Sequence, residues 1–194
     1  MSKYLMTQSL LSAWLYIYKA REDKEEEAYD SFLRVLNREP TETTKAMQKG
    51  IDFEDAVTAY LKGGEADGTV KTVGDMIRGA VLQVPVYLDR TIDGMDFLLY
   101  GRIDALKAGV IYDIKYSESY ETNKYLDSPQ HPIYLECLPS AREFRYLISD
   151  GKEVYVERYT RSETPSVDNV IRQFMSFLDQ YGLRDIYISK WQTW

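Results

Sequence analysis

Residues 95–116, MDFLLYGRIDALKAGVIYDIKY, decide the fold that we predict for this chain. The stretch is rich in β-branched and aromatic residues, which favour strands. Ala108-Gly109 interrupts it, and Asp93-Gly94 precedes it; both are dipeptides typical of tight turns between strands. The pattern predicts a meander of three strands: Val84 to Arg90, Met95 to Asp104, and Gly109 to Tyr116.

The second turn determines which side chains face each other. A two-residue turn at Ala108-Gly109 places Asp104 opposite Asp113, with Cβ atoms roughly 5 Å apart. Strand alternation puts Lys115 on the same face as Asp113. It sends the alternate side chains to the opposite, apolar face: Tyr112, Ile114 and Tyr116. We therefore expect two carboxylates and one ammonium to converge.

Two neighbouring acids on a packed sheet repel each other unless one keeps a proton or both share a cation. A divalent metal resolves this conflict. Ligand sets made only of oxygen suit Mg²⁺ or Mn²⁺, and Mg²⁺ leaves coordination positions open for water and substrate phosphate. The alternative is an ordinary hairpin in which Lys115 forms a salt bridge with Asp113 or Asp104. Other segments have to decide between the two.

A helix predicted from Thr41 or Thr43 to Gly63-Gly64 brings a third acid. Glu54 falls on its inward stripe, which reads Met47, Gly50, Glu54, Val57 and Leu61. An isolated charge there would cost several kcal/mol, so Glu54 requires a partner inside. The alternative is a shift of one residue, in which Asp52, Glu54 and Asp55 all face solvent.

A short helix is predicted after the third strand. Asp127-Ser128-Pro129 is typical of a helix start, and the helix should run to about Leu138. Gln130 and Tyr134 are four residues apart and therefore lie on one helix face, directly after the strand that carries Lys115. As an isolated pair they could equally form a surface hydrogen bond.

The remaining elements complete an α/β pattern. We predict two helices that cover the core (Ser2 to about Arg21 and Lys24 to Asn37), a hairpin around Asp150-Gly151 (Phe144 to Ser149 with Glu153 to Tyr159) and a last helix from Ser166 to Tyr181. We expect one domain over 1–194, with a helical cover (1–40), a core (about 41–160) and a C-terminal helix and tail (161–194).

Composition narrows the class of protein. Hydrophobic residues make up 44% and charged residues 28%, as in ordinary soluble domains, and no apolar stretch reaches the ~20 residues of a membrane span. Cys137 is the only cysteine, which excludes an internal disulfide and a cysteine-ligated cluster and makes a reducing cytoplasm the expected setting. The net charge of −7 argues against a broad nucleic-acid-binding surface.

These motifs together resemble the RecB-like branch of the PD-(D/E)XK nuclease superfamily, which includes phage exonucleases. Four segments match the family's motifs in order: Gly50-Ile51-Asp52-Phe53-Glu54, Gly101-Arg102-Ile103-Asp104, Asp113-Ile114-Lys115, and Gln130 to Tyr134. The resemblance implies a restriction-endonuclease-like core, a mixed central β-sheet flanked by helices in the order αβββαβ. It spans about Gly50 to Tyr134.

The resemblance also implies roles for individual residues. Asp104 and Asp113 would bind metal, Ile114 would offer its carbonyl oxygen, and Lys115 would orient or help to activate the attacking water. Glu54 stands where many relatives carry histidine, which keeps a metal ligand but leaves open whether one or two Mg²⁺ or Mn²⁺ ions bind. Gln130 and Tyr134 would orient the site and contact DNA. No iron–sulfur cluster is expected.

The expected function is a metal-dependent DNA nuclease, in particular an exonuclease of recombination, repair or phage DNA processing. A structure-selective endonuclease, an RNA-directed nuclease and a catalytically silent DNA-binding or scaffold member remain alternatives. DNA is the expected partner; a single-strand annealing or recombination protein and a homo-oligomer are open alternatives, and no membrane is expected. Strand polarity is not readable from the sequence.

The remaining residues carry weaker expectations. Tyr116 and Tyr120 are candidates for base stacking, and Arg142 and Arg145 for phosphate contacts. His131 is expected to face solvent at a helix start, and Cys137 to be a small buried hydrophobe. Two tryptophans near the end of a polar tail, Trp191 and Trp194, suggest docking onto the domain or another subunit.

Overall fold

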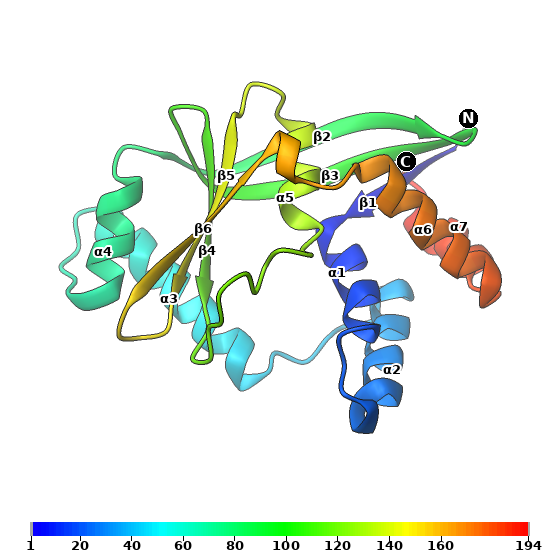
Figure 1. Cartoon of the computed structure of the whole chain (residues 1–194), viewed down its shortest axis with the longest axis horizontal. Helices are drawn as coiled ribbons and strands as arrows, with labels where there is room; N and C mark the ends of the chain where they lie inside the picture. The colour runs from blue at the N-terminus through cyan, green and yellow to red at the C-terminus, as the bar shows by residue number, and fades with distance from the viewer. Residues whose placement is uncertain (1, 194) are drawn as a thin grey trace.

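Six strands form one mixed sheet at the centre of the molecule (Figure 1). The computed structural model describes residues 2–193. The ladder runs β1-β3-β4-β5-β6, with β2 also paired to β3; the β1–β3 and β4–β5 pairs are parallel and the others antiparallel. The strands are β1 (Lys3–Thr7), β2 (Val81–Ile92), β3 (Met95–Lys107), β4 (Val110–Tyr116), β5 (Glu143–Ser149) and β6 (Val154–Thr160).

Helices cover both faces of the sheet. They are α1 (Gln8–Ile17), α2 (Glu25–Leu36), α3 (Lys45–Leu61), α4 (Gly68–Ile77), α5 (Gln130–Cys137), α6 (Val167–Gln180) and α7 (Arg184–Trp191), with short 3₁₀ turns at Glu22–Lys24 and Arg161–Glu163. On one face, α3 and α4 pack Phe53 and Val73 against Tyr112 and Ile114. The larger core lies on the other face, under α1, α2, α5, α6 and α7.

The long strand β3 is the backbone of this arrangement. One of its edges pairs with β2 over most of its length. The other edge pairs first with β1, at Asp96 to Tyr100, and then with β4, at Ala105 to Lys107. Residues 101–104 therefore have no strand partner on that edge. This gap between β1 and β4 exposes backbone groups that need other hydrogen-bond partners.

Tyr134 of α5 fills part of the gap. Its hydroxyl oxygen accepts a hydrogen bond from the Arg102 backbone N–H at 3.3 Å and donates one to the Arg102 carbonyl at 3.2 Å. The tyrosine ring lies directly over Gly101, where a Cβ atom would collide with ring carbons. Gly101 of the G-x-x-D motif and Tyr134, four residues after Gln130, thus pack directly against each other.

The main sequence-based expectations for the core are confirmed. The predicted order of one helix, three strands, one helix and one strand is present as α3, β2, β3, β4, α5 and β5, with α4 inserted after α3. The mixed central sheet flanked by helices is also as predicted. The Ala108-Gly109 turn gives the expected register, because Ala105 pairs with Tyr112 and Lys107 with Val110.

Several predictions at the periphery were wrong. Residues 3–7 form β1 rather than the start of a helix, because their backbone pairs in parallel with β3; Thr7 then caps α1 by accepting a hydrogen bond from the Leu10 N–H at 3.3 Å. Met47 is 54% exposed, so the buried stripe of α3 does not include it. Phe53, outside the predicted stripe, is buried instead.

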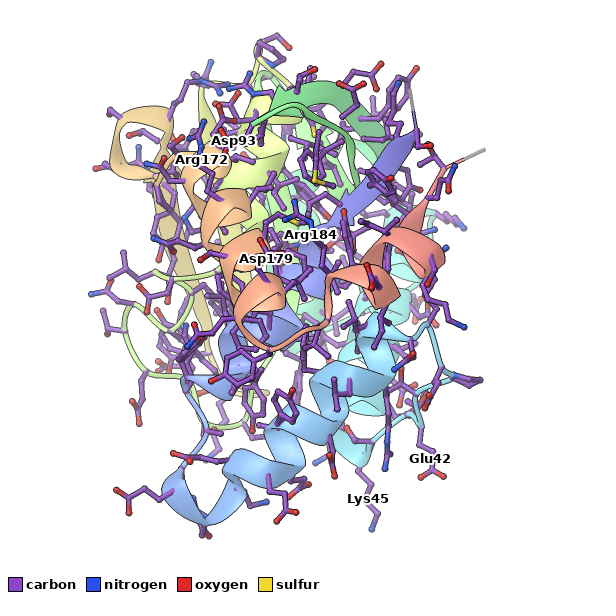
Figure 2. The ribbon with its side chains drawn as sticks, turned by 90° about the vertical axis from the view of Figure 1, so that its right-hand side faces the viewer. Glu42, Lys45, Asp93, Arg172, Asp179 and Arg184 are labelled. Carbon is purple, nitrogen blue, oxygen red and sulfur yellow. The ribbon has the colours of Figure 1, made fainter. Side chains whose placement is uncertain are left out.

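After α6 the chain forms one further helix, α7, in the segment that we predicted to be a polar tail. α7 carries Trp191, which is buried and donates its indole N–H to the Leu36 carbonyl at 2.8 Å. Trp191 therefore docks onto the domain itself, while Trp194 lies outside the described residues. Figure 2 shows the outer surface of α6, where Arg172 contacts Asp93 of the β2–β3 turn at 3.2 Å. Among the described helices, none has the length and apolar character that a bilayer crossing demands.

The contact between Gly101 and Tyr134 can be tested directly. Gly101→Ala should lower the free energy of unfolding by roughly 1–3 kcal/mol, because the added methyl group overlaps the tyrosine ring. Urea denaturation measures the change. Gly50→Ala is the control, since nothing lies within 4 Å of the position of its Cβ. Equal or greater stability of Gly101→Ala would contradict the packing described here.

Candidate active site

A pocket of about 310 Å³, which we call the carboxylate pocket, opens at the gap in the β3 edge. Seven of the residues singled out in the sequence line it, contributed by α3, β3, β4 and α5: Glu54, Asp104, Asp113, Ile114, Lys115, Gln130 and Tyr134. The sequence-based hypothesis required a helix glutamate and two strand aspartates to meet at one place. The pocket brings all three together, from both sides of the sheet.

Asp113 is the most deeply buried acid of the site, with 2% of its side chain exposed. One carboxylate oxygen, Oδ1, accepts a short hydrogen bond from the Gln130 side-chain amide. The other, Oδ2, lies 2.6 Å from Lys115 Nζ, in an ion pair. The expected salt bridge between Lys115 and Asp113 therefore exists.

Asp104 is held next to this pair. Its Oδ2 accepts a hydrogen bond from the Ile114 backbone N–H at 2.8 Å, which bridges β3 and β4 just beyond their last ladder pair. Burial, together with the negative charge of Asp113, raises the pKa of Asp104 to about 8. Burial opposes the charge on Lys115, but Asp113 and Asp104 outweigh it and raise the pKa of the ammonium. In the metal-free site Asp104 therefore keeps a proton at neutral pH, as expected where two acids share one lysine, and a divalent cation could take the place of that proton.

Glu54 reaches the pocket from α3, and a residue that sequence reasoning missed holds it there. Its Oε1 accepts a hydrogen bond from the Gln83 side-chain amide at 2.8 Å. Gln83 has a φ of 53°, in the left-handed region that costs a non-glycine residue about 1 kcal/mol or more. The register would place Gln83 opposite Asp104, and the β2–β3 ladder skips both. Asp52 and Asp55 on the same helix are exposed.

The start of α1 forms another wall that the sequence analysis did not anticipate. Thr7, Gln8 and Ser9 line the pocket because β1 ends beside Tyr100, at the edge of the gap. The one available signal was Thr7 itself, a good N-cap residue within a segment that we predicted to be continuous helix. Arg102, which is exposed, also lines the pocket.

The donor set fits a hard divalent cation. The groups available are the carboxylate oxygens of Glu54, Asp104 and Asp113, which line one pocket. Within residues 2–193, however, no three His, Cys, Asp or Glu side chains are already gathered as ligands. The residues that could hold the ion are Asp104 and Asp113 with the Ile114 carbonyl; Glu54 would have to leave Gln83 to join them.

The four residues proposed as candidates for base stacking or phosphate contacts lie outside the carboxylate pocket. Tyr116 packs its ring on Phe53, with centroids 5.6 Å apart, and Tyr120 stacks on Tyr155. Arg145 pairs with Glu143 beside it and lies over the Tyr112 ring, on the sheet face opposite Asp113. The backbone of Arg142 bonds to Gly109, at the far end of β4. None of the four is among the residues that line the carboxylate pocket.

His131 is fully buried, so the expectation that it faces solvent was wrong. Seven of the eight α5 residues are buried, because the helix lies between the sheet and the other helices. The His131 ring stacks on the Tyr159 ring, with centroids 4.1 Å apart, and His131 Nδ1 lies 3.1 Å from the Tyr146 hydroxyl oxygen. Cys137 is buried in the same core, as predicted.

Comparisons with known proteins establish the fold only. No family model matches the sequence, and no curated protein matches it. Among solved structures, SSO0001 aligns with a TM-score of 0.55 and 15% identity, over 93% of this chain and 78% of its own. The likeness is one of fold. LHK-Exo in complex with dAMP aligns over 93% of this chain and 92% of its own, with 13% identity and a TM-score of 0.45, too low to support an inference.

The burial of His131 predicts a pH dependence of stability. Desolvation lowers its pKa to about 4, against about 6.5 in the unfolded chain, so the unfolded state takes up a proton first as the pH falls. The free energy of unfolding should therefore fall by about 3 kcal/mol between pH 6.5 and pH 4 through this residue alone. Urea denaturation of His131→Phe over the same pH range measures the pH dependence that comes from other groups, such as carboxylates. If the free energy of unfolding depends on pH in the same way in wild type and in His131→Phe, the effect of His131 is refuted.

Proposed function

We propose that the chain is a metal-dependent DNA nuclease of the PD-(D/E)XK type, and specifically an exonuclease. The observation that carries the proposal is the convergence of Glu54, Asp104, Asp113 and Lys115 in one pocket at a gap in the sheet. An ordinary salt-bridged hairpin needs neither the buried second aspartate nor a glutamate from the opposite helix layer.

Each side chain has a part in this proposal. Asp104, Asp113 and the Ile114 carbonyl would hold one Mg²⁺ or Mn²⁺, and Glu54 would be available to a second ion or to the first. The bound ion would act as a Lewis acid and lower the pKa of water. Gln130 fixes the orientation of Asp113 through its amide, and Tyr134 satisfies the Arg102 backbone at the gap.

Lys115 orients the attacking water. Its ammonium lies 2.6 Å from Asp113 and lines the open pocket, so it can donate to a water aligned with a scissile phosphodiester. The raised pKa keeps this group charged at neutral pH. It therefore holds the nucleophile and offsets negative charge as the bond to phosphorus forms, rather than removing a proton itself.

The proposal predicts a loss of activity without a loss of fold. Asp113→Asn and Lys115→Met should each reduce Mg²⁺-dependent degradation of linear DNA by about 100-fold or more. Asparagine still accepts from Gln130, and methionine keeps the apolar stem of lysine, so circular dichroism should show native structure. The matched controls are Asp185→Asn and Lys62→Met, at exposed positions outside the pocket. Undiminished activity in either site variant would refute the assignment.

Cation binding is open to an independent test. Mn²⁺ at about 100 times its dissociation constant should raise the free energy of unfolding by about 2.7 kcal/mol, and EDTA should reverse the effect. Asp104→Asn should abolish the stabilisation, because the site loses one of its two central carboxylates. Asp185→Asn should retain it. Equal stabilisation of wild type and Asp104→Asn would place the ion elsewhere.

Substrate preference separates the proposed exonuclease from its alternatives. Linear duplex DNA, closed circular DNA, single-stranded DNA and RNA are each incubated with the protein in Mn²⁺. An exonuclease degrades linear DNA and spares circles. Cleavage of circles supports an endonuclease and preference for RNA an RNA-directed nuclease. No cleavage of any substrate by a Mn²⁺-binding protein supports a silent member of the fold.

A further inference from the structure

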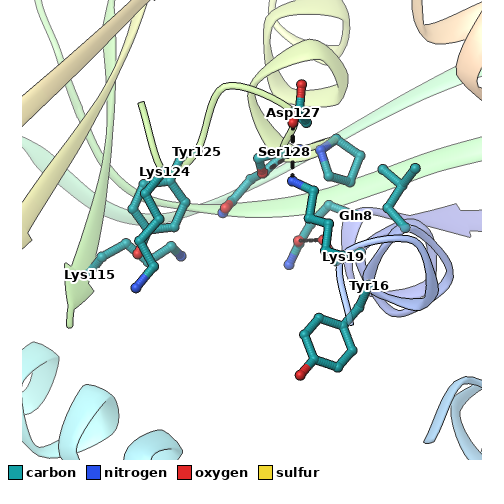
Figure 3. Close-up of a pocket in the computed structure, with 12 residues that line it drawn as sticks. Gln8, Tyr16, Lys19, Lys115, Lys124, Tyr125, Asp127 and Ser128 are labelled. Carbon is teal, nitrogen blue, oxygen red and sulfur yellow. Dashed lines mark hydrogen bonds and ion pairs between the residues drawn. The ribbon is translucent and has the colours of Figure 1, made fainter. Parts of the chain in front are cut away.

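A second pocket, of about 290 Å³, adjoins the carboxylate pocket (Figure 3). The two share Gln8, Lys115 and Gln130 on their walls, so a ligand in one can continue into the other. One side of the second pocket is formed by Gln8, Ser12 and Tyr16 of α1, with Lys19 just beyond the C-terminal end of that helix. The other side is the loop from Lys124 to Pro129, between β4 and α5. The proposed reaction assigns no role to this space.

The charge of this pocket is opposite to that of the whole chain. The charged side chains on its walls are three lysines, Lys19, Lys115 and Lys124, and one aspartate, Asp127. The Lys124 ammonium is held by neutral groups, the Ser117 hydroxyl at 2.5 Å and the Ser119 carbonyl at 3.1 Å. Lys19 Nζ lies 3.5 Å from Asp127 Oδ2, and both side chains are exposed, so this ion pair is weak. A chain of net charge −7 thus keeps cations beside its candidate active site.

Aromatic rings accompany these cations. Tyr16 is 53% exposed on the α1 side, and Tyr125 lines the pocket from the loop. Tyr125 rests on Tyr146, with ring centroids 4.6 Å apart and planes 18° from parallel, so its ring is fixed from behind. Lysines that neutralise phosphate beside rings on which bases stack are the elements of single-strand binding.

The loop wall is preformed by a buried carboxylate. Glu157 of β6 is 6% exposed and accepts three hydrogen bonds: from the Tyr120 hydroxyl at 3.0 Å, the Tyr125 backbone N–H at 3.2 Å and the Tyr159 hydroxyl at 2.6 Å. Two of these donors belong to the segment between β4 and α5. The carboxylate therefore holds Lys124 and Tyr125 beside the pocket before any ligand arrives, which lowers the cost of binding.

We propose that this second pocket binds one unpaired nucleotide of the strand being cut, with its phosphate between Lys19 and Lys124 and its base against Tyr16 or Tyr125. The volume is at the lower end of the roughly 300–1,000 Å³ of small-ligand sites, so it suits one nucleotide rather than a duplex. The inference rests on the proposed nuclease function and adds that the substrate strand enters the site unpaired.

Binding without turnover tests this pocket separately from catalysis. An internally labelled oligothymidylate is titrated with the full chain in EDTA, and fluorescence anisotropy gives the dissociation constant over a range of salt concentrations. The Lys19→Gln/Lys124→Gln double variant should bind about tenfold more weakly. Its logarithmic salt slope should be shallower by about 0.7, since the two lysines share one phosphate and each neutralised phosphate of a single strand contributes about 0.7. The Lys62→Gln/Lys190→Gln control, at exposed positions outside both pockets, should match wild type.

The outcomes separate the two proposals. An unchanged dissociation constant and slope in the pocket variant overturn the pocket, even if the wild-type protein cleaves DNA. Weakened binding in that variant, with no cleavage by wild type in Mn²⁺, supports the pocket and overturns the nuclease. Displacement of the oligothymidylate by inorganic phosphate as readily as by a mononucleotide overturns base recognition. An oligoribonucleotide that binds more tightly overturns the assignment to DNA.

Glu157→Gln provides a second, milder variant that leaves both lysines in place. The carboxylate accepts from three donors, and an amide can satisfy only some of them, so the loop should become less well held. Affinity for the oligothymidylate should fall while the salt slope stays at the wild-type value, because no phosphate contact is lost. A change of slope equal to that of the double lysine variant would contradict this positioning role.

Discussion

The feature on which the site depends is the interruption in the β3 edge. β1 and β4 both pair with that edge, but neither covers residues 101–104. A sheet cannot leave such groups buried without partners, and here a side chain replaces a strand: Tyr134 bonds to both backbone groups of Arg102. Because the partner is a side chain, the sheet has an opening there that a continuous ladder would close.

The opening explains how groups from both layers meet. Asp113 and Lys115 face the α5 side of the sheet, whereas Glu54 belongs to α3 on the other side. Hydrogen-bond donors hold all three acids: the side-chain amide of Gln130 holds Asp113, the backbone N–H of Ile114 holds Asp104, and the side-chain amide of Gln83 holds Glu54. These donors orient the oxygens, and Lys115 pairs with Asp113, so one ammonium faces three acids that a divalent cation could draw together.

The parts of the site that rest on local rules could be predicted from the sequence. Strand alternation and one turn placed Asp113 and Lys115 on one face, and helical spacing placed Gln130 with Tyr134. Predictions failed where distant segments decide the outcome. β1 exists because Lys3–Thr7 pairs with β3, and Gln83 acts through an unusual backbone angle at a skipped ladder position. His131 sits on a helix buried on nearly all sides, so helical periodicity gives no outward face.

The central claim is that the oxygens gathered at this opening hold a divalent cation. Anomalous diffraction from crystals grown in Mn²⁺ tests it most directly. The account predicts a peak between the carboxylates of Asp104 and Asp113, within about 2.0–2.2 Å of an oxygen from each and close to the Ile114 carbonyl. Saturating Mn²⁺ with no peak at the opening, or with a peak bound to neither aspartate, would contradict it.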